Sequence, residues 1–97
     1  MQEVLYYSSL YDIYKDLLTE KQQKYFEEYY FLNLSLQELA DNYKVSKNAV
    51  YKQVQNATKK LVYYESKLKL LKKKEILEDI IEQIDDNNIK KKIIKII

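Results

Sequence analysis

Lysine and amide side chains recur between residues 44 and 59 at spacings that bring them to one side of an α-helix. From Asn48 to Lys59 the central ones follow steps of four, three and four residues. Asparagine and glutamine can pair bidentately with adenine, and lysine can reach guanine or phosphate. The pattern indicates a nucleic-acid-binding face. Its candidate residues are Lys44, Ser46, Lys47, Asn48, Tyr51, Lys52, Gln55, Asn56 and Lys59.

The candidates differ in where they lie on the expected helix. Tyr51 and Asn56 flank the central face. Lys44, Ser46 and Lys47 lie at the helix start, where free backbone amides favour phosphate. An ordinary solvated polar face is the alternative. Such a face normally mixes charges of both signs, and no acidic residue occurs from residue 44 to residue 64, so the binding interpretation is favoured.

Charge is distributed unevenly along the chain. The formal net charge is +2, but residues 44–74 contain ten lysines and a single acidic residue, Glu65. Residues 1–43 and 75–97 both carry an excess of acidic side chains. A face that binds a polyanion gives this distribution, and so does a lysine-rich solvated helix encoded by an AT-rich genome. Composition by itself leaves both interpretations open.

Residues suited to catalysis or metal binding are scarce. Histidine and cysteine are absent, which removes the commonest general base, the commonest metal ligand and any disulfide. Asp12 and Asp16 share one helix side and Asp85–Asp86 share a loop, but neither pair has a third ligand nearby. Ser35 and Ser46 lack a base to activate them. We therefore expect no enzyme activity, metal, cofactor or small-molecule substrate.

Chain length and the missing turn residues define the fold class. Ninety-seven residues allow one domain with a single core. Glycine and proline are absent, which disfavours hairpins and favours helices joined by short polar links. We predict an all-α protein. It comprises a small helical bundle with a helix-turn-helix over residues 1–74 and a long C-terminal helical extension of the same domain over residues 75–97.

Capping signatures mark the expected helix starts. Thr19 with Gln22 matches the capping box, and so does Ser35 with Glu38. Ser46 can cap a further helix. The spacing of apolar residues predicts where the remaining helices begin and end. The expected helices cover residues 3–18, 20 to about 32, 36–43, 46 to about 71, 76–84 and 89–97.

Residues 36–54 have the dimensions of a helix-turn-helix, with a short helix, a tight turn and a second helix. Ala40 is small where the second helix should cross, Val45 should plug the turn into the core, and Val50 should anchor the second helix. Lys44 takes the turn position that usually has a positive φ and prefers glycine. Similar helix pairs also occur in bundles that bind nothing, so the motif does not by itself establish binding.

The second helix of this motif carries a long apolar seam. Its positions from Val50 to Leu71 follow alternating steps of four and three residues, which predicts one uninterrupted helix. Tyr64, Leu68 and Leu71 would then lie beyond the small core. Either the helix over residues 76–84 folds back on them or a second copy covers them. We favour a homodimer, which would present two recognition helices to a palindromic site.

A longer stretch of sequence resembles a known family. It comprises Leu17-Leu18-Thr19-Glu20-Lys21-Gln22-Gln23-Lys24-Tyr25, then Tyr29-Tyr30, Leu34-Ser35-Leu36, Glu38-Leu39-Ala40, Val45-Ser46-Lys47 and Ala49-Val50-Tyr51. These residues resemble the YlxM family, small bacterial proteins whose helix-turn-helix is similar to the DNA-binding fourth region of sigma factors. The resemblance covers about residues 5–75. Lys47 stands where the family usually has arginine, which keeps the charge but loses the bidentate fork.

The resemblance also implies a partner. Family members are encoded beside the GTPase of the signal recognition particle and its receptor, so the family is thought to assist or regulate that targeting pathway. Our leading hypothesis is a helix-turn-helix regulator that binds DNA. The alternative is an accessory factor that binds the particle's RNA or GTPase. The sequence shows neither a leader nor a run of about 18 apolar residues, so we expect a cytoplasmic protein without membrane insertion.

Overall fold

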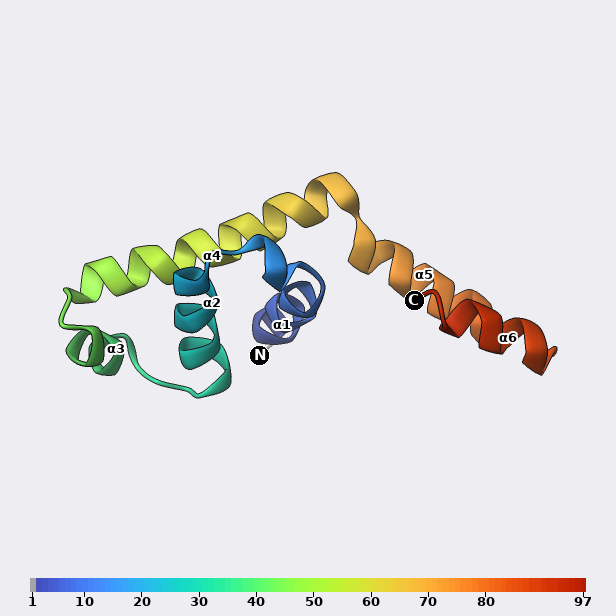
Figure 1. Cartoon of the computed structure of the whole chain (residues 1–97), viewed down its shortest axis with the longest axis horizontal. Helices are drawn as coiled ribbons and strands as arrows, with labels where there is room; N and C mark the ends of the chain where they lie inside the picture. Colours follow the sequence, from blue (N-terminus) through green and yellow to red (C-terminus); the bar gives the residue numbers. More distant parts are fainter. Residues whose placement is uncertain (1) are drawn as a thin grey trace.

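The chain folds as a set of short helices packed along one long helix (Figure 1). This computed structural model describes residues 2–97. Within that range every regular element is helical, which confirms the all-α prediction. The elements are α1 (Gln2–Tyr14), η1 (Lys15–Leu17, a 3-10 turn), α2 (Glu20–Phe26), η2 (Glu27–Phe31, a π-helical turn), α3 (Leu36–Tyr43), α4 (Lys47–Leu68), α5 (Leu70–Glu82) and α6 (Asn87–Ile94).

Side-chain caps begin α2, α3 and α4, as the sequence predicts. The Thr19 hydroxyl accepts a hydrogen bond from the Gln22 amide (3.1 Å), and the Gln22 side chain accepts one from the Thr19 amide (3.0 Å). Ser35 and Glu38 form the same reciprocal pair before α3, at 3.0 and 3.1 Å. The Ser46 hydroxyl accepts an amide hydrogen in the first turn of α4. Each cap satisfies an amide that its helix leaves free.

α4 forms one wall of two adjacent hydrophobic clusters. α1 and α2 pack against its middle, and α2 and α3 pack against its first half. The buried residues of the first cluster are Leu10, Tyr11, Tyr14, Leu18, Phe26, Ala57 and Leu61. Those of the second cluster are Tyr25, Leu39, Ala40, Val50 and Val54. The apolar seam of α4 is therefore fully used between Val50 and Leu61, and this use fixes which side of the helix faces solvent.

Tyrosine rings contribute much of this core, and their hydroxyls pair with glutamates at its edge. Tyr11 donates a hydrogen bond to Glu27 (2.7 Å), and Tyr43 donates one to Glu28. Burial and the bond to Glu27 raise the pKa of Tyr11. The bond to Glu28 and burial raise the pKa of Tyr43 to about 12. These hydroxyls therefore stay protonated at neutral pH and act as donors that anchor α1, η2 and α3 to one another.

The prediction of one uninterrupted helix through Leu71 is wrong. α4 ends at Leu68, because Lys69 adopts the left-handed conformation (φ 55°, ψ 33°) and its amide bonds to the Glu65 carbonyl (2.9 Å). α5 then begins at Leu70 and includes the lysine run at residues 72–74. The spacing of apolar residues continues unchanged across this break, so periodicity could not reveal it.

A single carboxylate holds the junction between α1, α4 and α5. Glu65 accepts hydrogen bonds from the Tyr14 hydroxyl (2.7 Å) and from the amides of Leu71 (3.0 Å) and Lys72 (3.2 Å). The Tyr14 hydroxyl in turn accepts one from the Leu70 amide (3.1 Å). Burial by itself would raise the pKa of Glu65, but the three hydrogen bonds outweigh it and hold the pKa below its ordinary value. The carboxylate thus caps the start of α5.

The junction also changes how the end of the seam is covered. Leu71 lies on α5, and both it and Tyr64 pack against the first hydrophobic cluster. The chain therefore covers these two residues itself, through the start of α5 rather than through a helix over residues 76–84. Leu68 remains exposed.

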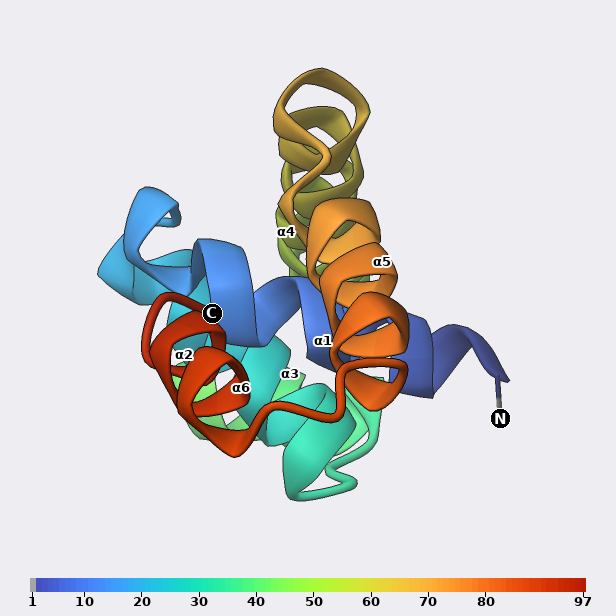
Figure 2. The same cartoon turned by 90° about the vertical axis from the view of Figure 1, so that its right-hand side faces the viewer.

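α5 and α6 run back along each other and extend away from the bundle as an arm, which the two views in Figures 1 and 2 show. The molecule measures 56 × 24 × 22 Å, and its radius of gyration is 17.0 Å. A compact chain of this length would have a radius of gyration of about 12–13 Å. Between Leu70 and Ile94 no residue of either helix is fully buried. The arm is thus the least consolidated part of the described structure.

Ala40→Val tests the crossing of α3 and α4. Ala40 is 3% exposed, so a branched side chain should overpack the crossing and lower the free energy of unfolding by about 1–3 kcal/mol. The melting temperature should fall by about 4–8 °C for each kcal/mol in a domain of this size. Thermal unfolding followed by circular dichroism measures the shift. Lys21→Gln, at an exposed position on α2, is the control, and equal small shifts in both variants would contradict this packing.

Glu65→Gln tests the junction. Because the folded-state pKa of Glu65 lies below 4.5, its carboxylate stabilises the fold above that pH, and the contribution is lost as the pH falls through the folded-state pKa. Urea unfolding should show the wild type to be more stable than the variant at neutral pH, with a difference that shrinks below pH 4.5. Glu75→Gln, on the exposed side of α5, should show no such difference. A difference between wild type and Glu65→Gln that is constant with pH would exclude a role for the charge.

Candidate nucleic-acid interface

A tight left-handed turn joins α3 to α4. Lys44 has φ 55° and ψ 46°, as predicted for this position, and its amide bonds to the Ala40 carbonyl. The Val45 amide bonds to the same carbonyl (3.0 Å), which completes a Schellman-type helix end. Val45 is 41% exposed, so the prediction that it plugs the turn into the core is wrong. Hydrogen bonds close the turn instead, and Leu39 and Val50 fill the space beneath it.

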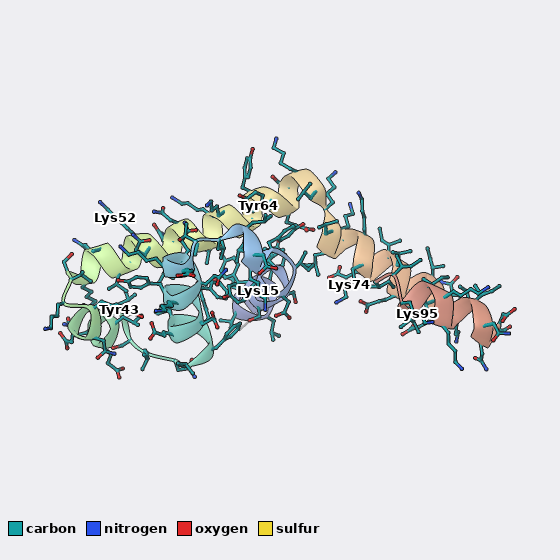
Figure 3. All side chains as sticks on the ribbon, viewed as in Figure 1. Lys15, Tyr43, Lys52, Tyr64, Lys74 and Lys95 are labelled. Carbon is teal, nitrogen blue, oxygen red and sulfur yellow. The ribbon has the colours of Figure 1, made fainter. Side chains whose placement is uncertain are left out.

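The structure exposes all nine candidate residues. Val50 and Val54 point into the core, and the helical rotation of 100° per residue therefore places Asn48, Lys52 and Lys59 on the opposite, solvent-facing side of α4. Figure 3 shows Lys52 on the side of α4 turned away from α2 and α3. Asn56 lies on one flank of this face and is also exposed. The predicted central residues thus share a single accessible face.

Two of the candidates are engaged with each other on the other flank. The Gln55 side-chain amide donates a hydrogen bond to the Tyr51 hydroxyl (2.6 Å). Both residues belong to the exposed surface, and both also line a groove between α4 and α1. Gln55 can therefore read a base edge only after giving up this hydrogen bond. The sequence placed Gln55 at the centre of the face, whereas the structure places its amide at the edge.

The start of α4 is suited to an anion. Lys47 and Asn48 occupy the first turn, where backbone amides have no carbonyl partner within the helix and the helix dipole is positive. The Ser46 hydroxyl accepts a hydrogen bond from the Ala49 amide (3.1 Å), so Ser46 acts first as a helix cap rather than as a ligand for phosphate. The side chains of Lys44 and Lys47 are exposed beside these amides. A phosphate at this place would meet free backbone amides at the positive end of the helix dipole.

The charge of the face follows from where the single acidic residue of the basic segment lies. Glu65 is partly buried and turned toward α1 and α5, where three hydrogen-bond donors occupy its carboxylate. It therefore offers no partner to the lysines on the exposed side of α4. Lys44, Lys47 and Lys52 remain exposed to solvent. Such a surface attracts a polyanion.

The candidate set stopped short of basic residues at the far end of α4. Lys67 and Lys69 are exposed, and the Lys67 ammonium lies 5.8 Å from the ring centroid of Tyr63. Tyr63 is itself 58% exposed. The excess of lysine over residues 44–74 could have indicated these residues. The candidate residues were chosen from one face of the expected helix, however, and the last of them is Lys59. The basic surface extends along the whole of α4.

Two structural findings concern other kinds of site. Among residues 2–97, no helix combines the length and the apolar character needed to cross a membrane. The same residues contain no cluster of three or more carboxylate, histidine or cysteine ligands that could hold a metal ion.

A short helix, a left-handed turn and a longer exposed helix define this chain as a helix-turn-helix protein. Its whole length, residues 1–97, matches the UPF0122 family, which is described as "Putative helix-turn-helix protein, YlxM / p13 like". The chain belongs to this family. The resemblance predicted from the sequence is confirmed, and it extends beyond residues 5–75 to the arm.

Relatives from several bacteria share most of the chain. A UPF0122 protein of Mycoplasma capricolum is 44% identical over 92 residues, which cover 95% of this chain and 81% of the relative. A UPF0122 protein of Mycoplasma pneumoniae is 38% identical over 87 residues, with 90% and 85% covered. A UPF0122 protein of Geobacillus kaustophilus is 41% identical over 86 residues, with 89% and 78% covered.

Proposed function

We propose that this protein is a cytoplasmic regulator that binds DNA through α4 and has no catalytic role. The observation that carries the proposal is the exposed lysine and amide face from Lys44 to Lys59, which contains no acidic side chain. In helix-turn-helix proteins the second helix enters the major groove with its first residues at base edges, and the first helix crosses the backbone. Asn48 and Lys52 lie in that first part of α4, and Lys59 lies further along, within reach of phosphate.

The hydrogen bonding of Gln55 and the side-chain type at position 47 favour a second function. Gln55 is hydrogen bonded to Tyr51, and Lys47 offers a point charge without a bidentate fork. Both features suit phosphate binding better than base reading. Double-stranded RNA is recognised mainly through shape, phosphate and 2′-hydroxyl groups. We therefore keep as the alternative an accessory factor of the signal recognition particle that uses the same face on the particle's RNA or GTPase.

Lys52→Ala and Lys59→Ala test the face. Each removes one exposed positive charge from α4, so each should weaken binding to a short DNA duplex and reduce the slope of log affinity against log salt by about 0.7–0.9. Fluorescence anisotropy at two salt concentrations measures both quantities. Lys24→Ala removes an equally exposed charge from α2 and is the matched control. Unchanged affinity and slope in the two α4 variants would remove α4 from the binding surface.

The same assay separates the two functions. Asn48→Ala should lower affinity for duplex DNA if α4 reads bases, and should leave affinity for the particle's RNA nearly unchanged if the face reads shape and phosphate. Running both nucleic acids beside each other decides between a DNA regulator and an RNA-binding accessory factor. Binding to neither nucleic acid, with binding to the GTPase, would favour a protein partner.

We also propose a homodimer in which residues 1–74 form the binding unit and residues 75–97 extend it toward a second copy. Two open hollows of about 340 and 370 Å³ lie beside α5 and the chain end, and leucine and isoleucine side chains form much of their lining. Its exposed apolar residues include Ile76, Leu77, Ile80, Ile89, Ile94 and Ile97. α5 bears acidic residues from Glu75 to Glu82, and α6 bears the basic run Lys90–Lys92. A surface with both signs can complement itself across a two-fold axis.

The dimer predicts a concentration-dependent mass that depends on the arm. Ile80→Lys combined with Ile94→Lys places charges among exposed isoleucines, so sedimentation should show a dimer for the wild type at tens of micromolar and a monomer for the variant. A useful interface of about −8 kcal/mol forms near 1 μM. Leu32→Lys changes an exposed leucine outside the arm and should leave the dimer intact. A wild-type monomer at tens of micromolar would rule out the homodimer.

A further inference from the structure

A groove lined by tyrosines runs beside α4 on the flank opposite Asn56. It consists of two adjoining cavities with volumes of about 510 and 240 Å³. Glu3, Tyr29 and Tyr30 line both cavities. The smaller one reaches Tyr7 on α1 and Tyr51 on α4. The groove thus collects residues from the beginning of α1, from η2 and from α4, and it shares Tyr51 and Gln55 with the candidate nucleic-acid interface but none of its lysines.

The rings of the groove are held in fixed orientations. Tyr29 and Tyr30 pack edge to face with ring centroids 5.0 Å apart and planes at 86°. Tyr7 and Tyr30 do the same at 5.8 Å and 61°. Edge-to-face packing directs the negative faces of neighbouring rings in different directions, so a ligand between them meets more than one electron-rich surface. Burial, with further contributions from Tyr7, Tyr29 and Glu3, raises the pKa of Tyr30 to about 12, so its hydroxyl stays neutral.

The charge of the groove is negative. Among the described residues that line the two cavities, Glu3 is the one with an ionisable acid or base group other than tyrosine. The remaining polar groups are neutral, including the amides of Asn33 and Gln55. Residues 1–43, which supply most of the lining, carry an acidic excess, whereas α4 on the other side of the groove is basic. A carboxylate among tyrosine faces is the surrounding that an ammonium or guanidinium group requires.

The backbone beside the groove is unusual in two places. Tyr29 and Tyr30 lie on η2, a π-helical turn, and π-helical turns occur frequently at functional sites. Asn33, which follows that turn, has φ 57° and lines the larger cavity. The left-handed conformation of Asn33 costs conformational energy, and the π-helical turn contains both tyrosines. A core that required nothing but packing could use an ordinary helical turn here.

We propose that this groove binds a lysine or arginine side chain from a basic peptide segment of a partner protein. The smaller cavity accepts the charged group between Tyr7, Tyr30 and Glu3, and the larger one accommodates the neighbouring peptide residues beside Asn33. A nucleic acid is the less suitable occupant, because Glu3 repels phosphate. The groove adjoins the lysine face of α4 at Tyr51 and Gln55 but contains none of its lysines, so failure of this inference would leave the DNA-binding proposal standing.

Isothermal titration of the full chain with a short peptide of alternating arginine and alanine tests the inference. Glu3→Gln should raise the dissociation constant by about three- to tenfold. Asp12→Asn removes an equally exposed charge from the same helix, away from the groove, and should have little effect. Tyr29→Leu should weaken binding to a similar extent, and Tyr29→Phe, which keeps the ring face, should restore most of the affinity.

Three results would overturn the inference. Equal losses in Glu3→Gln and Asp12→Asn would mean that only net charge attracts the peptide. Full affinity in Tyr29→Leu, with its melting temperature showing a folded protein, would exclude the aromatic contact. Displacement of the peptide by single-stranded oligothymidylate at low concentration, with Glu3→Gln improving the binding of the oligonucleotide, would assign the groove to a nucleobase instead. Glu3 is exposed, so its variant reports on binding even if the tyrosine variants unfold.

Discussion

The chain contains no glycine, so its left-handed turns are made by residues with a Cβ. The fold depends on interactions that offset the free-energy cost of these turns. Asn33, Lys44 and Lys69 have φ between 55° and 57°, a conformation that costs residues with a Cβ roughly 1–2 kcal/mol. Each follows a helical segment and comes just before a capped helix start. Ser35 caps α3 and Ser46 caps α4, each two residues after a left-handed residue, and the Glu65 carboxylate caps α5 directly after Lys69. The hydrogen bonds of the caps offset the unfavourable backbone.

The exposed lysine and amide face of α4 follows from these reversals. The turn at Lys44 lays α3 across the first half of α4, and the second core cluster then fixes the rotation of α4. The lysines and amides must face solvent because the valines of the seam face the core. The same rotation directs Glu65, one turn after the buried Leu61, toward α1, and the reversal at Lys69 brings the amides of α5 onto its carboxylate. Packing and charge separation thus have one origin.

Sequence reasoning predicts the parts of this structure that rest on local chemistry. The caps at Thr19, Ser35 and Ser46 and the buried crossing at Ala40 follow from residue types at fixed spacings. The break at Lys69 does not, because the glycine that would mark it is absent and the apolar spacing continues through it. The exposure of Val45 and the bond between Gln55 and Tyr51 depend on tertiary contacts. The groove at Tyr29 and Tyr30 could not be predicted from the sequence, because a π-helical turn has no clear sequence signature.

The most direct test of the binding surface is an amide chemical-shift map of the isotopically labelled protein during titration with a short DNA duplex, and in parallel with the RNA of the signal recognition particle. We expect the largest shifts between Lys44 and Lys59, with an extension toward Lys67 and little change in α1 and α2. Because α4 is rigidly packed, shifts there report contact rather than refolding. Shifts concentrated on the acidic helices or on the arm, with α4 unchanged at saturation, would contradict the account.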